Sequence, residues 1–118
     1  MKNSKILIVD DDEDVLLAAK LLLKNNVSVI HTEKNPQLIP QLIKNESYDV
    51  IFLDMNFTED MTLGKEGFFW LNEILKIDNT IAVVLLTAYA SIDLAIKAVR
   101  LGASDFVEKP WDNKKLLS

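Results

Sequence analysis

The sequence predicts a fold of alternating strands and helices built on a buried parallel sheet. Apolar runs of strand length alternate with segments of helical period along the whole chain, in five pairs. One run, Ile81 to Leu86, has no polar alternation, which is typical of a strand buried on both faces. No internal repeat, low-complexity tract or linker is visible. The 118 residues are therefore expected to form one α/β domain, 1–118, with one core.

The first strand–helix pair occupies the beginning of the chain. Lys5 to Val9 is the expected strand, and a helix follows from Asp12 or Glu13 to Lys24. Aspartates lead this helix and Asn25-Asn26 ends it, as helix-dipole and C-cap preferences favour. Its apolar stripe should consist of Val15, Leu16, Ala19, Leu22 and Leu23.

The second pair is shorter. A strand is expected from Val27 to His31 and a helix from Pro36 to Lys44, although Pro40 is unfavourable inside a helix. The residues of this helix that should face the core are Leu38, Ile39, Leu42 and Ile43.

The third pair contains a long connection. Asp49 to Leu53 is the expected strand, followed by a polar loop from Met55 to about Lys65. A helix from Glu66 to Lys76 comes next, and Asp78-Asn79 turns the chain.

The last elements surround the most apolar strand. Ile81 to Leu86 is expected at the centre of the sheet, and a helix from Ser91 to Leu101 should end at Gly102. Ser104 to Val107 is the fifth strand. Trp111 to Ser118 covers only about two helical turns, too few for stability alone, so we expect a truncated last helix.

Composition excludes several classes of protein. Thirteen basic and eighteen acidic side chains give a formal charge of −5, which disfavours direct contact with nucleic acid. The absence of cysteine excludes disulfides, thiolate metal sites and cysteine nucleophiles. The first apolar run, about five residues, is too short for a signal peptide or a membrane span. We therefore expect a soluble cytoplasmic protein without membrane contact.

Carboxylates follow two of the expected strands. Asp10 to Asp12 come after the first strand and Asp54 comes after the third. Parallel strands deliver such residues to one edge of the sheet, where open α/β sheets bind ligands. Carboxylates a few ångströms apart repel by roughly 4 kcal/mol per pair at an effective dielectric near 20. Either a proton or a cation must therefore neutralise the cluster.

The expected cation is a hard divalent ion. A site of carboxylates without histidine or thiol favours Mg2+ over zinc or iron. Thr87 after the fourth strand and Lys109 after the fifth would reach the same edge. A carboxylate nucleophile, Mg2+, a hydroxyl donor and a lysine together suit phosphoryl transfer, with an aspartyl phosphate at Asp54 as the product.

Four segments carry a family resemblance: ILIVDDDED (Ile6 to Asp14), VIFLDMN (Val50 to Asn56), VLLTA (Val84 to Ala88) and AIKAVRLGASDFVEKPW (Ala95 to Trp111). Together they resemble the receiver domain of response regulators, such as the chemotaxis response regulator, over essentially the entire chain. The resemblance implies a flavodoxin-like (βα)5 doubly wound fold of three layers, α/β/α, with strand order 2-1-3-4-5.

The resemblance implies a metal site and a phosphoacceptor. Asp54 would accept a phosphoryl group from a phosphohistidine on a sensor histidine kinase. Asp11 and Asp54 would bind Mg2+ directly, Asp10 through a water, and Asn56 through its backbone carbonyl. The domain would catalyse its own phosphorylation and dephosphorylation without being a turnover enzyme.

The resemblance also implies a switch. Lys109 would pair with the phosphoryl oxygens, and Thr87 would move to hydrogen-bond one of them. Phe106 falls at the family's rotating aromatic position, and Lys109-Pro110 at its cis peptide. Tyr89, two residues after Thr87, would lie beside the phosphate entrance, where its ring could restrict the hydrolytic water and lengthen the phosphorylated lifetime.

One loop departs from the family pattern. Asn56 to Lys65 is about five residues longer than the usual turn after the phosphoacceptor, a length at which loops become functional or mobile. Gly67 still fits the family's glycine. The loop and the following Glu66 to Leu71 (EGFFWL) resemble receivers fused to NtrC-like, sigma-54-dependent transcription regulators.

The subfamily resemblance implies further partners. An output domain with ATPase and DNA-binding parts would follow the receiver. Dimerisation stays open at this point, and a homodimer would use the face formed by the fourth helix, the fifth strand and the fifth helix.

Several alternatives stay open at this point. VIFLDMNFT (Val50 to Thr58) is close to the motif of haloacid-dehalogenase-like phosphatases, but Asn56 replaces their acid/base aspartate and cannot exchange a proton at neutral pH. A module that interacts without phosphorylation is a second alternative. A nucleotide-binding site is disfavoured, because no glycine-rich turn follows the first strand. Asp10 to Asp12 could simply cap a helix, and Phe106 could be an ordinary core residue.

Overall fold

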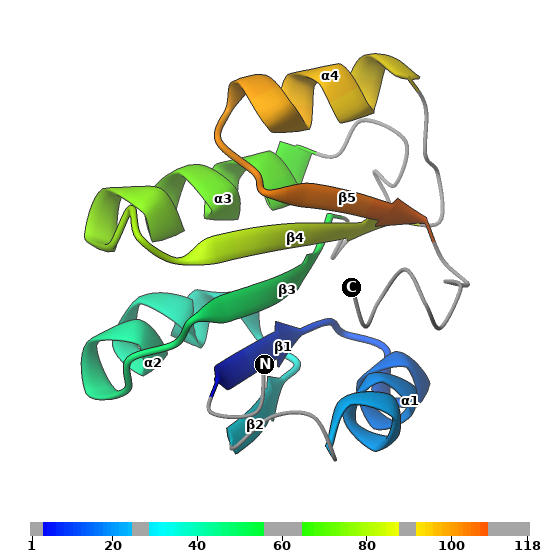
Figure 1. Ribbon diagram of the computed structural model, residues 1–118, viewed down its shortest axis with the longest axis vertical. Helices are drawn as coiled ribbons and strands as arrows, with labels where there is room; N and C mark the ends of the chain where they lie inside the picture. The colour runs from blue at the N-terminus through cyan, green and yellow to red at the C-terminus, as the bar shows by residue number, and fades with distance from the viewer. Residues whose placement is uncertain (1–3, 25–28, 56–64, 88–91, 109–118) are drawn as a thin grey trace.

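The computed structural model describes residues 4–24, 29–55, 65–87 and 92–108, which form a parallel sheet covered by helices (Figure 1). The elements are β1 (Lys5–Val9), α1 (Glu13–Leu23), β2 (Val29–Glu33), the 3-10 turn η1 (Pro36–Leu38), α2 (Ile39–Asn45), β3 (Val50–Asp54), α3 (Lys65–Ile77), β4 (Ala82–Thr87), α4 (Ile92–Arg100) and β5 (Asp105–Glu108). The strand order is β2-β1-β3-β4-β5. This order confirms the flavodoxin-like topology expected from the resemblance to receiver domains.

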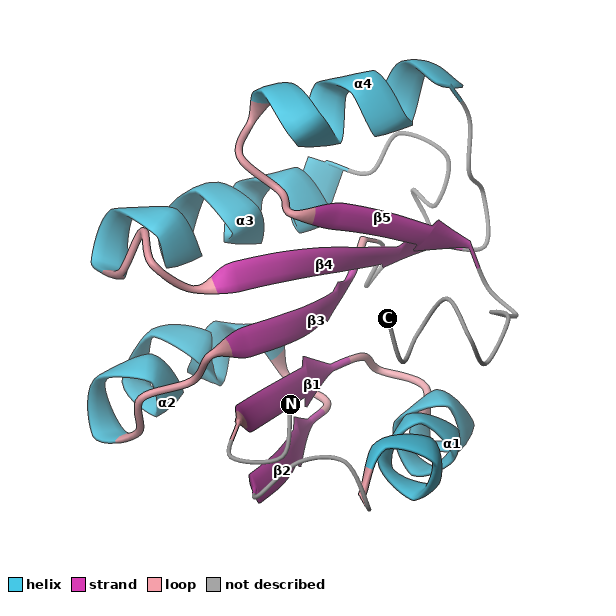
Figure 2. Ribbon diagram, viewed as in Figure 1, coloured by secondary structure: helices cyan, strands magenta, loops and turns pink. Residues whose placement is uncertain are grey.

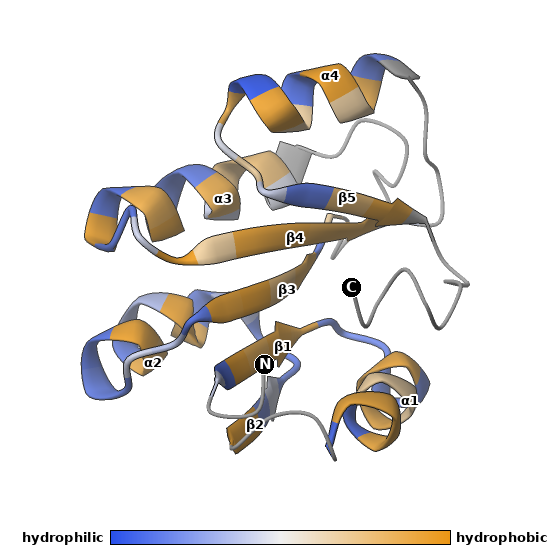
Figure 3. Cartoon of the chain, viewed as in Figure 1, coloured by the Kyte–Doolittle hydropathy of each residue, from blue (hydrophilic) through white to orange (hydrophobic). Residues whose placement is uncertain are grey.

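The described helices lie on both faces of the sheet. Helix α1 lies on one face, and α2, α3 and α4 lie on the other (Figure 2). Neighbouring residues of a strand point to opposite faces, so Leu7 and Val9 of β1 join the core on the α2–α4 side, whereas Ile6 and Ile8 join the core on the α1 side. Strands β1, β3 and β4 are mainly hydrophobic along their length (Figure 3). This two-sided burial confirms the doubly wound fold.

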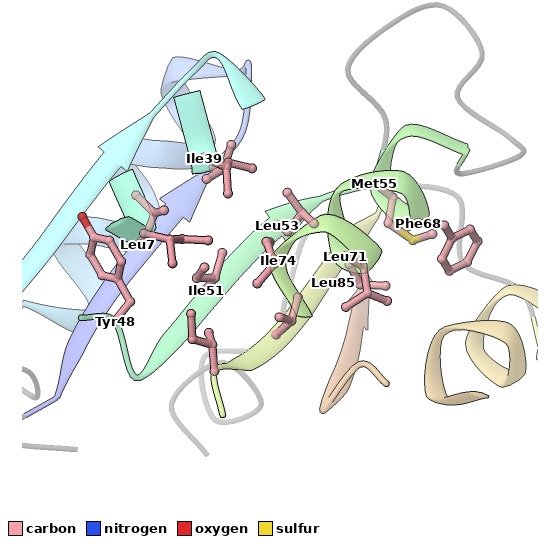
Figure 4. Close-up of a cluster of buried hydrophobic side chains, with 14 of the residues drawn as sticks. Leu7, Ile39, Tyr48, Ile51, Leu53, Met55, Phe68, Leu71, Ile74 and Leu85 are labelled. Carbon is pink, nitrogen blue, oxygen red and sulfur yellow. The ribbon is translucent and has the colours of Figure 1, made fainter. Parts of the chain in front are cut away.

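The larger core lies between the sheet and helices α2, α3 and α4 (Figure 4). Its buried members are Leu7, Val9, Ile39, Ile43, Tyr48, Ile51, Leu53, Met55, Phe68, Leu71, Ile74, Ile81, Val83, Leu85 and Ala98. Met55 follows β3 directly and is 0% exposed. The chain immediately beyond the carboxyl end of β3 is therefore anchored in this core.

The smaller core lies under α1. Leu16, Ala19 and Leu23 are buried there in one cluster with side chains of β1, β3, β4 and β5. Val15 and Leu22 are half-buried. Spacings of three and four residues place these side chains on one helical face, as the predicted stripe requires. Burying a leucine fully contributes about 1.5–3 kcal/mol, so this stripe holds α1 against the sheet.

Two helix ends form as the sequence predicts. Asp12 is the N-cap of α1, and its side chain accepts a hydrogen bond from the backbone N–H two residues along (2.9 Å). At the end of α4, Gly102 has a φ of 104°, and its N–H donates to the Val99 carbonyl (3.1 Å). The next N–H, of Ala103, donates to the Ala98 carbonyl (3.0 Å). These two bonds form a Schellman motif, which turns the chain from α4 towards β5.

The second strand differs from its predicted range. It spans Val29–Glu33 rather than Val27 to His31, and residues 25–28 lie outside the described part of the chain. Lys5 pairs with Val29 and Val9 with Glu33, so β2 matches β1 over its full length. Because β2 is an edge strand, its polar residues remain solvated, and the apolar pattern ends before the strand does.

The predicted second helix is divided. Pro36 begins the 3-10 turn η1, and Pro40 lies in the first turn of α2, where its missing N–H costs no helical bond. Ile39 and Ile43 are buried as expected, but Leu38 is 39% exposed. The prediction that Leu38 faces the core is wrong because this residue ends η1 before the α-helical period begins.

The central strand of the sheet is β3, not the predicted fourth strand, although β4 is flanked by β3 and β5. Of the loop expected from Met55 to about Lys65, residues 56–64 lie outside the described residues, as does the last helix expected from Trp111. Within the described residues, the helices are too short or too polar to cross a membrane.

Candidate functional site

Three carboxylates meet at the carboxyl edge of the sheet. Asp10 follows β1, Asp54 is the last residue of β3, and Asp11 lies next to Asp10. One carboxylate oxygen from each lies within 4.8 Å of the other two. Asp10 is 0% exposed and Asp54 is 4% exposed, whereas Asp11 is open to solvent. The structure therefore brings together three of the four aspartates that the sequence places near one edge.

Strand pairing creates this cluster. Val9 pairs with Leu53, so the residues that follow them, Asp10 and Asp54, reach the same level of the sheet. The Asp10 N–H donates to the carbonyl of Glu33 at the end of β2 (3.1 Å). The sheet thus holds the backbone of the cluster, and little backbone freedom remains to relieve the repulsion between the carboxylates.

The fourth aspartate of the group has a separate role. The Asp12 N–H donates to Asp10 Oδ1 (3.0 Å), while the Asp12 side chain caps α1. The capping interpretation therefore holds for Asp12. The Asp10 carboxylate thus accepts a local bond of the same type, from the backbone N–H two residues along, but its burial beside Asp54 distinguishes it from a surface cap.

The donor atoms of the cluster fit a hard cation. All of them are carboxylate oxygens, the ligands that Mg2+ prefers, and none is a histidine nitrogen or a sulfur. Three negative charges this close repel one another, and burial of two of them strengthens the repulsion. A divalent ion would remove this repulsion, so the residues present fit Mg2+.

Thr87 lies at the same edge of the sheet. It is the last residue of β4, and it is 0% exposed. Asp54 pairs with Leu86, so Thr87 comes one residue beyond the level of the acidic strand end. Thr87 in turn pairs with Glu108 at the end of β5. The described part of β5 therefore ends beside β4 at this edge.

Phe106 lies in the middle of β5, paired with Leu85. Its side chain is half-buried and packs against the larger core. A half-buried ring at the last strand of the sheet agrees with both the core interpretation and the rotating-aromatic interpretation.

Four predicted positions cannot be placed. Asn56, Tyr89, Lys109 and Pro110 lie outside the residues that the structure describes. Their expected roles stay predictions.

Gly67 has a packing requirement that the sequence does not reveal. Its N–H donates to the Met55 carbonyl (2.8 Å). A Cβ atom at this position would lie 2.4 Å from Met55 Cα. This distance is too short for two carbon atoms that are not bonded, so the backbone would have to shift. The first turn of α3 therefore touches the residue that follows Asp54, which explains in physical terms why a glycine stands here.

A cation beside the cluster was not predicted. Lys34, just after β2, pairs with Glu13 at the start of α1, with 2.7 Å between Nζ and Oε1. The hydrogen bond to Glu13 and its charge raise the pKa of Lys34, and the charge of Asp11 adds to the effect. Both partners are mainly exposed, so the pair contributes little to stability. Nothing in the sequence indicates it, because the partners are 21 residues apart.

Comparison with known proteins agrees with this geometry. The family model described as "Response regulator receiver domain" matches residues 6–118. The regulatory protein AtoC of Escherichia coli is 31% identical over 115 residues, which are 96% of this chain and 23% of that protein. The chain spans about a quarter of the length of the first curated relatives that it matches.

Two solved structures are similar over almost the whole chain. The receiver domain of a two-component response regulator from Bacteroides fragilis has 48% identity and a TM-score of 0.86, covering 98% of this chain and 92% of that one. The receiver domain of NtrX from Brucella abortus has 27% identity and a TM-score of 0.83, covering 96% and 92%.

Proposed function

Because this chain belongs to the response regulator receiver domain family, we propose that Asp54 accepts a phosphoryl group and that the modified domain switches an output domain. The family consists of phosphoacceptors rather than typical turnover enzymes. The observation that carries the proposal is the buried Asp54 carboxylate with Asp10 and Asp11 beside it at the carboxyl edge of the sheet.

Receiver domains bind Mg2+ at an acidic pocket, and we assign the ligands of this chain from the cluster. Asp11 and Asp54 would bind the ion directly, Asp10 through a water, and Asn56 through its backbone carbonyl. When bound, Mg2+ neutralises charge that develops on the phosphoryl oxygens. The burial of Asp54 restricts its side chain, which would help to hold the carboxylate in line with the phosphorus.

The donor would be a phosphohistidine of a sensor histidine kinase. A carboxylate oxygen of Asp54 attacks the phosphorus, the new P–O bond forms while the P–N bond breaks, and the imidazole leaves with the bonding electron pair. Lys109 would pair with the transferred group. Hydrolysis by water later returns the free Asp54 carboxylate, and Tyr89 would restrict access of that water.

The transferred group would bias the domain between two states. A dianionic group at Asp54 gives Thr87 and Lys109 a new partner, so conformations that bring these residues inward gain binding energy. The burial of Thr87 at the same edge supports this role. Phe106 pairs with Leu85 of β4. A change in its side-chain conformation would transmit the change at the site to the α4–β5 surface.

The output is proposed from the relatives. Those matched first are named as transcriptional regulatory protein ZraR and regulatory protein AtoC, and each is about four times longer than the matched region. We infer that this receiver controls a transcription regulator of the NtrC-like, sigma-54-dependent type, with ATPase and DNA-binding parts. A homodimer through α4, β5 and the following helix would be the switched assembly.

Mass spectrometry of the intact protein tests the acceptor. Incubation with a small phosphodonor and Mg2+ should add one phosphoryl group to the wild type and none to Asp54→Asn. An adduct on both proteins, or on neither, contradicts the proposal. Release of many phosphates per protein molecule from phosphate esters would instead favour the haloacid-dehalogenase-like alternative.

A further inference from the structure

The first turn of α3 is attached to the backbone beside Asp54. Met55 is fully buried, its carbonyl accepts the Gly67 N–H (2.8 Å), and the absence of a side chain at Gly67 allows this approach. Met55 also donates its N–H to the Leu86 carbonyl of β4 (2.9 Å). The peptide units of Met55 therefore connect β4 to α3. A displacement of the backbone after Asp54 must move this turn or break one of these bonds.

Helix α4 rests on the same turn of α3. Phe68 follows Gly67 and is 6% exposed. The ammonium of Lys97, in the middle of α4, lies 4.8 Å from the centroid of the Phe68 ring. This is a cation–π contact, whose strength depends on the position of the cation over the ring face. The ring thus contacts the larger core and the Lys97 ammonium of α4.

Apolar residues also attach α4 to the larger core. Leu94 is half-buried and packs against it. Ala98 is buried in the larger core, and its carbonyl closes the Schellman motif with Ala103. Ile96 and Val99 point outward and are 48% and 66% exposed. Lys97 thus provides a polar attachment of α4 to α3 beside these apolar ones.

We propose that Lys97 is a positioning residue that couples α4 to the phosphoacceptor through Phe68, Gly67 and Met55. This route is separate from the one through Thr87 and Phe106. It rests on the proposed function of Asp54, and it adds a connection on the α3 side of the site. In the unmodified state the contact holds α4 against α3. A shift of the Met55 backbone on modification moves the Phe68 ring relative to Lys97 and changes the stability of α4.

Amide hydrogen exchange of α4 tests this coupling in the intact chain. Beryllofluoride with Mg2+ serves as the mimic of the phosphoryl group. Wild-type α4 should change its exchange rates on loading. Lys97→Gln should exchange about two- to five-fold faster in α4 before loading, as loss of a cation–π contact predicts, and its rates should change less on loading.

Two variants separate coupling from a loss of charge. Lys97→Arg keeps a cation that can lie over the ring and should behave like the wild type. Arg100→Gln removes a positive charge three residues away on the same exposed helix, and it should leave the response to loading unchanged. A third variant, Phe68→Leu, removes the ring together with its core packing. Adding Lys97→Gln to Phe68→Leu should change the response of α4 to loading no further, since the contact is already lost.

The outcomes distinguish the two proposals. If Lys97→Gln loads and its α4 responds as fully as that of the wild type, the coupling is wrong. Additive effects of Lys97→Gln and Phe68→Leu would also overturn it. If the wild type itself does not bind beryllofluoride, the proposed function of Asp54 fails, and the coupling fails with it.

Discussion

Asp10 and Asp54 stand at equivalent positions on two adjacent parallel strands, directly after the paired residues Val9 and Leu53. Both carboxylates are buried, and an oxygen of each lies within 4.8 Å of the other. Backbone pairing between the two strands sets this distance. The site therefore has a defined geometry, from which the effects of substitutions can be predicted.

Asp11→Asn should weaken Mg2+ binding. The substitution keeps the size of the side chain but removes the charge of the exposed member of the cluster. We expect the affinity for Mg2+ to fall by at least roughly ten- to hundred-fold, the loss typical when a residue that only supports a metal ligand is removed. Calorimetric titration measures the change. Asp12→Asn is the matched control, because asparagine also caps a helix and this side chain faces α1. Equal losses in both variants would contradict the assigned ligands.

Gly67→Ala should both destabilise the domain and slow phosphorylation. The new Cβ would meet the Met55 backbone, and such overpacking costs about 1–3 kcal/mol. Urea unfolding measures the stability, and adduct formation with a phosphodonor measures the rate.

Gly102→Ala provides the comparison for Gly67→Ala. Its φ of 104° strains any side chain, at a cost of about 1–3 kcal/mol. Its Cβ would meet only the flexible end of Leu75. The phosphorylation rate should therefore stay unchanged. If Gly102→Ala slows phosphorylation as much as Gly67→Ala, the effect is one of general stability and not of the Met55 contact.

Tyr48 should make stability fall at alkaline pH. Burial, followed by the nearby charge of Glu46, raises the pKa of the Tyr48 hydroxyl. The folded state therefore favours the protonated hydroxyl. This contribution is fully present below the unfolded pKa of about 10 and is lost as the pH rises through the higher folded pKa. Unfolding curves recorded between about pH 9 and 11, a range that includes the unfolded tyrosine pKa, measure this loss. The free energy of unfolding should fall less in Tyr48→Phe than in the wild type.

His31→Gln is the control for this pH dependence. It removes the ring that contacts the Tyr48 hydroxyl but leaves the buried phenol in place. The alkaline loss should persist in this variant. A wild-type alkaline loss that is identical in Tyr48→Phe would show that other groups, such as the Lys5 ammonium with its raised pKa, account for it.

Thr87→Ala should separate phosphorylation from switching. The hydroxyl is not the acceptor, so the phosphoryl adduct should still form on Asp54. A hydrogen bond to a charged group contributes about 1.5–3 kcal/mol, so its loss should reduce the population of the switched state by about ten-fold or more. Amide exchange in β5 measures that population. Thr87→Ser keeps the hydroxyl and should retain the response, and a full response in Thr87→Ala would refute this role.

The sequence predicts the strands best where apolar residues run without interruption. Lys5–Val9 is confirmed to the residue, and β3 and β4 are each shifted by one. The predicted range of β2 is wrong because the second half of the strand is polar, and only its pairing with β1 reveals it. The prediction for Leu38 is wrong because a 3-10 turn has a different period from an α-helix.

The acidic cluster could be predicted because residues at the ends of parallel strands share an edge. Contacts between distant side chains could not. Lys34 with Glu13 and Lys97 with Phe68 depend on how helices and loops pack, and no local pattern encodes either pair. The requirement for glycine at position 67 likewise becomes visible only with the backbone of Met55 in place.

The rigid placement of the aspartates has a thermodynamic consequence. Because the strands cannot separate to relax the crowded charges, an ion that binds only the folded chain must raise its unfolding free energy, by about 2.7 kcal/mol at a concentration 100 times the dissociation constant. The melting temperature of this domain should therefore rise with the concentration of free divalent metal, even when Asp54 is not phosphorylated.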